Sequence, residues 1–173
     1  MNDRIGFSTT TNWLSRLIRW FTQASVSHAW LLYFDVDFGG REMVLEATLE
    51  GVRIIPFEIF KKKNIIVKIT TPSHDLKRGL ALAGDTLGSG YDFTGLFGML
   101  WVTLGRWFKK KWKNPWERPH SMFCSEFVAQ VLKWSSYPGT DFWDVGAMAP
   151  QDLYEFFMRQ EIAAATTKTQ LPP

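Results

Sequence analysis

Apolar and polar residues alternate in short runs along the first half of the chain, and these runs predict β-strands. Over residues 28–34 the even positions carry His28, Trp30, Leu32 and Phe34, and because both faces are largely apolar we expect a buried strand. Further apolar runs predict three more strands, over residues 43–48, 51–55 and 65–70. Since short connections join the first three of these strands, we expect an antiparallel meander.

Apolar residues at helical spacing predict four helices. These cover residues 13–21, 74–87, 124–134 and 151–159. The spacing is clearest in the third, where Phe127, Val128, Val131 and Leu132 follow Cys124 at i+3, i+4, i+7 and i+8. Strands combined with helices in this order predict an α+β fold in which a helix that begins with the cysteine packs against an antiparallel sheet or barrel.

The length of the chain favours one domain. With 173 residues, of which 46% are hydrophobic, the chain can bury a single core, which we place in residues 1–160. Within it, residues 91–120 are rich in Trp, Gly and Lys and are interpreted as a basic, aromatic insertion or flap. The Thr, Lys, Gln and Pro residues near the end predict a disordered tail over residues 161–173.

The single cysteine excludes an intramolecular disulfide framework, and the three histidines have no Cys or His neighbour at zinc-ligand spacing. We therefore expect no metal and no cofactor. The first residues lack the basic and apolar regions of a signal peptide, and the longest apolar stretch, Leu96–Leu104, is too short to cross a bilayer. These features predict a cytoplasmic protein.

Cys124 stands where a cysteine nucleophile would be activated. It occupies the predicted first turn of its helix, where free N–H groups and the helix dipole favour a thiolate and can form an oxyanion hole. The alternative is a buried, inert packing residue, because a lone cysteine on an apolar helical face is usually one. The cysteine alone does not decide between the two.

His28 and Glu46 are candidates for the base and for the group that orients it. His28 begins a buried strand, where an imidazole can be aimed firmly. Glu46 lies in the next strand, and a hairpin centred near residue 37 would set it almost opposite His28. A carboxylate in an otherwise apolar strand needs a partner, and an imidazole N–H is a suitable one. The alternative for His28 is a satisfied core or edge histidine.

Four short motifs, in this order along residues 25–133, resemble a known family. They are Ser27-His28, then Glu46-Ala47 leading into Gly51-Val52, then Gly90-Tyr91-Asp92, and finally Phe123-Cys124-Ser125-Glu126. The set is similar to the permuted NlpC-like, papain-fold cysteine amidases and peptidases of the YaeF/YiiX type. In that branch the His strand precedes the Cys helix, as it does here, whereas ordinary papain-like enzymes have the reverse order.

The resemblance implies a role for each matching residue. Cys124 would be the nucleophile, His28 the base and acid, and Glu46 the orienter of His28. Tyr91 would line the site beside the oxyanion hole, with Ser125 as a second oxyanion or substrate-binding residue; a turn residue packed on the core is the alternative for Tyr91. The chain departs from the family in its first motif, since Arg4–Ser8 replaces the usual Gly-Asp strand.

The basic, aromatic segment suggests a possible partner surface. Trp101, Trp107 and Trp112 alternate with lysines such as Lys110, a combination that suits the interface of an anionic membrane or a lipid-like substrate. Stacking on single-stranded nucleic acid is a less favoured reading. A solvated basic helix with its tryptophans in the core is the third.

Three functions remain open at this stage. The first is a thiol hydrolase that forms a thioester while cleaving a cell-wall peptide or an N-acyl, lipid-like amide. The second is a lipid acyltransferase or thioesterase of the lecithin:retinol acyltransferase type, although those relatives carry an Asn-Cys-Glu-His type of motif. The third is a non-catalytic papain-like module, for instance of a phage particle. The sequence does not address the oligomeric state.

Overall fold

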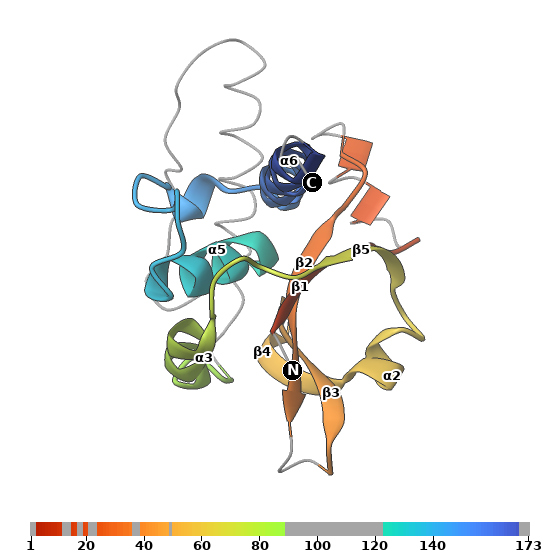
Figure 1. The fold of residues 1–173 in the computed structure, drawn as a ribbon. Coiled ribbons are helices and arrows are strands. Elements are labelled where there is room, and N and C mark those ends of the chain that lie inside the picture. Colours follow the sequence, from red (N-terminus) through yellow and green to blue (C-terminus); the bar gives the residue numbers. More distant parts are fainter. Residues whose placement is uncertain are drawn as a thin grey trace.

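The fold is described from a computed structural model of the chain (Figure 1). It covers residues 3–11, 15–16, 19–20, 24–35, 39–48, 50–88 and 123–169. Most of the helix predicted at 13–21 and all of the segment 91–120 lie outside these residues. Ser15, Arg16, Arg19 and Trp20 are helical within that first prediction.

The described residues form an α+β fold with an open, five-stranded antiparallel sheet. Its strands are β1 (Arg4–Thr9), β2 (His28–Asp35), β3 (Arg41–Thr48), β4 (Gly51–Pro56) and β5 (Ile65–Thr70). They lie in the order β4-β3-β2-β1-β5. The four predicted strands are confirmed to within two residues at their ends, and their apolar alternation explains why they form.

Strand β1 is the element that the hydrophobic pattern did not predict. It lies between β2 and β5, so the sheet is a meander only from β2 to β4. Its central residue, Gly6, pairs with Trp30, and the Trp30 ring lies across the backbone there: a Cβ atom on Gly6 would come within 2.2 Å of the ring. The missing side chain that weakens the strand signal is therefore what lets Trp30 pack over β1.

Besides the helical residues 15–16 and 19–20, four helices and one 3-10 turn complete the described fold. They are α2 (Phe57–Phe60), α3 (Lys77–Gly84), α5 (Cys124–Trp134), η1 (Val145–Ala147) and α6 (Pro150–Thr169). Helix α5 has the predicted bounds, while α3 is shorter than the prediction of 74–87.

Helix α6 corrects the prediction for the end of the chain. It continues to Thr169 and so includes residues 161–169, for which the sequence predicts a disordered tail. Glu161 provides a physical reason, because its carboxylate accepts hydrogen bonds from Lys68 Nζ at 2.7 Å and from Thr70 Oγ1 at 2.6 Å, both on β5. Alanines, which favour helix, follow Glu161.

The sheet separates two apolar clusters. Figure 1 shows α3 and α5 on one side of the sheet and α2 on the other. The larger cluster joins alternate residues of the strands, such as Ala29 and Leu31, to Phe127 and Val128 of α5. The smaller cluster lies on the α2 side and consists of Trp30, Leu32, Val44 and Phe60. Within the described ranges, no helix combines the length and the apolar character needed to cross a membrane.

Candidate active site

One end of the sheet gathers the residues on which the sequence prediction depends. Strand β2 begins there at His28, which pairs with Ser8, and β1 ends there at Thr9, which pairs with Ile65 at the start of β5. Strand β3 ends at the same edge, where Glu46 pairs with Arg53 of β4. The antiparallel order of the strands thus brings segments from four separate parts of the sequence to the same end of the sheet.

His28 and Glu46 are in direct contact. The Nε2 atom of His28 lies 2.6 Å from Oε2 of Glu46, and Glu46 is only 2% exposed. The observed register pairs Leu31 with Leu45, and one more step places Glu46 beside Trp30, two residues along from His28 rather than opposite it. The face is the predicted one, because a two-residue offset keeps both side chains on the same side of the sheet.

Cys124 is the first residue of α5 and is buried. Its sulfur accepts hydrogen bonds from the backbone N–H groups of Ala29 and Ser125 and shares a side-chain hydrogen bond with His28. Because Nε2 of His28 faces Glu46, Nδ1 is the ring nitrogen left for the sulfur. The structure therefore links Cys124, His28 and Glu46 in one chain of hydrogen bonds.

The electrostatics of this chain favour a thiolate beside an imidazolium. Burial raises the pKa of the Cys124 thiol, but the charge and hydrogen bond of His28, together with the amides of Ala29 and Ser125, lower it further, and the net pKa is below the ordinary value. Burial lowers the pKa of His28, but the Cys124 and Glu46 interactions outweigh it and raise that pKa to about 10. Each charged group holds the other in its charged state.

Arg53 belongs to the candidate site, although the sequence analysis did not identify it. Its Nε and Nη2 atoms each donate to Oε1 of Glu46 at 3.0 Å, and its Nη1 atom donates to Glu50 at 2.7 Å. Burial raises the pKa of Glu46, but the hydrogen bonds and charges of His28 and Arg53 lower it below the usual value. Arg53 therefore keeps Glu46 ionised and leaves its second oxygen to His28. An Arg opposite a buried Glu in the next strand was the signal available in the sequence.

Packing around His28 restricts its position. The Phe60 ring of α2 stacks on the imidazole, with ring centroids 6.2 Å apart and planes 30° apart. Ser27, the residue before His28, belongs to a buried cluster of hydroxyl groups. Its Oγ forms hydrogen bonds with Ser15 Oγ at 2.6 Å and with Thr9 Oγ1 at 3.2 Å. The start of β2 is thus held by side chains as well as by the sheet.

The other predicted site residues have different outcomes. The hydroxyl of Ser125 donates to the backbone oxygen of Met148 at 2.6 Å and is fully buried, so only its backbone N–H faces the sulfur. Five predicted residues lie outside the described part of the chain: Tyr91, Trp101, Trp107, Lys110 and Trp112. Among the described residues, no three His, Cys, Asp or Glu side chains are grouped so that they could hold a metal ion.

The arrangement of Cys124, His28 and Glu46 can perform nucleophilic catalysis. A thiolate at a helix N-terminus has N–H groups beside it for a developing oxyanion, and an imidazole within hydrogen-bond reach can transfer a proton. No protein-family model matches the chain, and no curated protein sequence is similar enough to it to serve as a relative. The functional conclusion therefore depends on the geometry of these residues.

Proposed function

We propose that the protein is a cysteine amidase or peptidase with a permuted papain-like fold. The order of the elements supports the fold assignment: the histidine strand β2 precedes the cysteine helix α5, and α5 packs against β2 and β3 of an antiparallel sheet. The single observation that carries the function is that His28 is hydrogen-bonded to Cys124 and to Glu46 at the same time.

Cys124 and His28 carry out the chemical steps. The Cys124 thiolate attacks the carbonyl carbon of an amide, and backbone N–H groups at the start of α5 stabilise the resulting oxyanion. The His28 imidazolium gives its proton to the leaving amine, the C–N bond breaks, and a thioester remains on Cys124. Neutral His28 then removes a proton from water, the hydroxide attacks the thioester, and the product acid leaves as the thiolate–imidazolium pair is restored.

Burial strengthens the case for catalysis over a purely structural role. Glu46 and Cys124 are 2% and 6% exposed, and burying ionised groups costs several kcal/mol in general terms before pairing offsets the cost. A binding module does not need a buried ion pair beside a lone thiol, since apolar residues of similar volume often give equal or greater stability. A catalytic site needs both charges.

Acyl-enzyme trapping tests the proposal. The chain is incubated with p-nitrophenyl esters of acetate and hexanoate, and mass spectrometry detects an acyl group on Cys124, which as the only cysteine gives an unambiguous thioester signal. We expect rapid acylation that disappears in Cys124→Ser and slows at least about a hundredfold in His28→Ala, the lower end of a general-base contribution. Acylation at the same rate in His28→Ala, or none in the unmodified chain, would contradict the proposal.

The scissile group is an amide of a peptide or an N-acyl compound. Papain-like sites of this kind act through the thioester described above, and the same thioester could be passed to another acceptor. Water is the acceptor in the proposed reaction, so release of free acid from the acylated chain in plain buffer is the second readout of the same experiment.

A further inference from the structure

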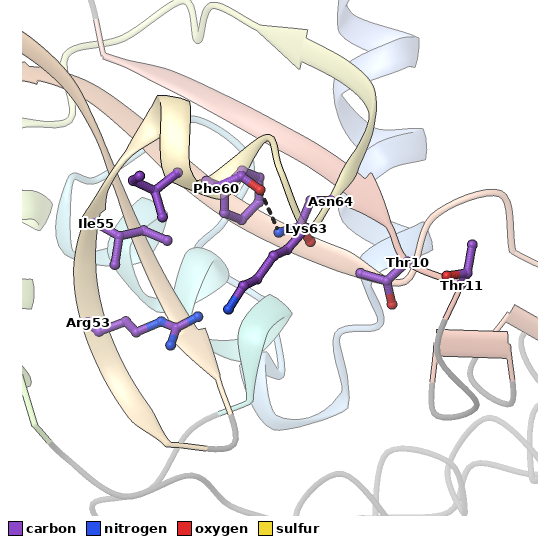
Figure 2. Close-up of a pocket in the computed structure, with 8 residues that line it drawn as sticks. Thr10, Thr11, Arg53, Ile55, Phe60, Lys63 and Asn64 are labelled. Carbon is purple, nitrogen blue, oxygen red and sulfur yellow. Dashed lines mark hydrogen bonds between the residues drawn. The ribbon is translucent and has the colours of Figure 1, made fainter.

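A pocket of about 340 Å³ opens at the same end of the sheet as the candidate site. Figure 2 shows the side chains around it, which come from the residues just after β1, from β4, and from α2 with the turn that follows it. The lining residues are Thr10, Thr11, Arg53, Ile55, Ile59, Phe60, Lys63 and Asn64.

Two of these residues connect the pocket to the catalytic set. Phe60 forms part of the wall and stacks on the His28 ring. Arg53 forms another part and holds Oε1 of Glu46 through two hydrogen bonds. A molecule in the pocket would therefore lie against the residues that fix His28 and Glu46.

The side chains that line the pocket carry two positive charges, on Arg53 and Lys63, and no negative charge. Arg53 is balanced by Glu46 and Glu50, whereas Lys63 has no ion-pair partner within the described ranges. Figure 2 shows Lys63 and Arg53 reaching toward the same space, with no acidic side chain among the pocket-lining residues. Lys63 is therefore the lining cation that lacks a counter-ion, and an anion bound in the pocket would supply one.

The rest of the wall combines neutral polar groups with an apolar surface. Thr10, Thr11 and Asn64 supply hydroxyl and amide groups on one side, and Asn64 is fixed by a 3.1 Å hydrogen bond from its Nδ2 to the backbone oxygen of Phe60. Ile55 and Ile59 supply the apolar part. A single carboxylate next to a short aliphatic segment matches this combination, because one lysine balances one negative charge.

We propose that this pocket binds a carboxylate-bearing part of the substrate, so that the preferred substrate is an acidic acyl-amide or peptide. This inference rests on the proposed function for its link to catalysis, but the binding itself does not need the thiol. It also separates the three lysines of the run 61–63: Lys61 lies 4.9 Å from the centre of the Phe57 ring, and only Lys63 lines the pocket.

The test compares two ligands that differ in one charge. Calorimetry measures the binding of N-hexanoylglycine and of its neutral amide, N-hexanoylglycinamide, to the full chain carrying Cys124→Ala. We expect the acid to bind roughly fivefold or more tightly than the amide, as one charge-assisted hydrogen bond allows. Lys63→Gln should remove that preference, while the adjacent Lys62→Gln should keep it.

Several results would overturn the inference. Equal affinity for the two ligands, no measurable binding of either, or an equal loss of preference in Lys62→Gln would each do so. Because the tested chain has no thiol, these outcomes are independent of the acylation experiment. A failed acylation together with a carboxylate preference that depends on Lys63 would refute the hydrolase and leave the pocket as an acid-binding site.

Discussion

Replacing Glu46 by Gln isolates the contribution of one negative charge without changing the size of the side chain. Glu46 accepts two hydrogen bonds from Arg53 on Oε1 and faces Nε2 of His28 with Oε2. In Glu46→Gln the amide oxygen must accept the two hydrogen bonds from Arg53, since an NH2 group at that position would face two other N–H donors. The NH2 group then faces Nε2, which can only accept a hydrogen bond, and the ring is left neutral.

A neutral His28 no longer stabilises the thiolate. Hydrogen bonds to charged groups contribute about 1.5–3 kcal/mol, which corresponds to a loss of thiolate of about 10- to 150-fold. The loss appears where an ordinary thiol is protonated, near pH 6. The assay is the rate of alkylation by iodoacetamide at that pH, followed by mass spectrometry on the only cysteine of the chain.

Glu50→Gln is the matched control. Glu50 is bound to the same arginine, but its side chain is 80% exposed and does not contact His28. We expect its alkylation rate to stay within about twofold of the unmodified chain, since exposed ion pairs contribute little. A Glu46→Gln chain that is alkylated at pH 6 as fast as the Glu50→Gln chain would refute the role assigned to Glu46.

Two further predictions concern the scaffold of the site. Gly6→Ala should destabilise the fold by about 1–3 kcal/mol in urea unfolding, because its Cβ would meet the Trp30 ring at 2.2 Å. Gly84→Ala is the control and should be neutral or stabilising, because a Cβ on Gly84 would have nothing within 4 Å. An equal loss of stability in the two variants would be inconsistent with the packing described for β1. Ser125→Ala should cost about 1–3 kcal/mol, because the Met148 backbone oxygen loses its hydrogen-bond donor, but should not change Cys124 alkylation at pH 6. A slower alkylation with unchanged stability would instead place the Ser125 hydroxyl in the site.

Elements with a strong hydrophobic period were predictable from the sequence. Strands β2 to β5 and helix α5 follow the alternation or the helical spacing of their apolar residues. Strand β1 was missed because Gly6 interrupts its pattern, and the reason for that glycine is a tertiary contact with Trp30. The end of α6 was missed because a local polar composition says nothing about the bonds of Glu161 to β5.

Within the candidate site, the sequence favoured the residues that break a local pattern. Glu46 stands out as an acid in an apolar strand, and its contact with His28 follows from a hairpin between neighbouring strands. Taken alone, Arg53 and Phe60 do not stand out, because a half-exposed arginine and a phenylalanine are common in any chain. Their roles depend on the register of β4 and on the position of α2, which bring them to Glu46 and His28.

The pH dependence of Cys124 alkylation tests the central claim most directly. With the pKa of Cys124 lowered and that of His28 raised to about 10, the thiolate–imidazolium pair persists between the two values and is lost on the acidic side only below the lowered thiol pKa. An ordinary thiol gains roughly 75-fold in thiolate between pH 6 and pH 8.

The unmodified chain should show a clearly smaller rise over that interval. In His28→Ala, burial without the imidazolium should raise the thiol pKa above its ordinary value, so the alkylation rate should climb steeply throughout and be lower at pH 6. If the two chains give the same steep profile, His28 does not activate Cys124, and the thiol hydrolase account is wrong.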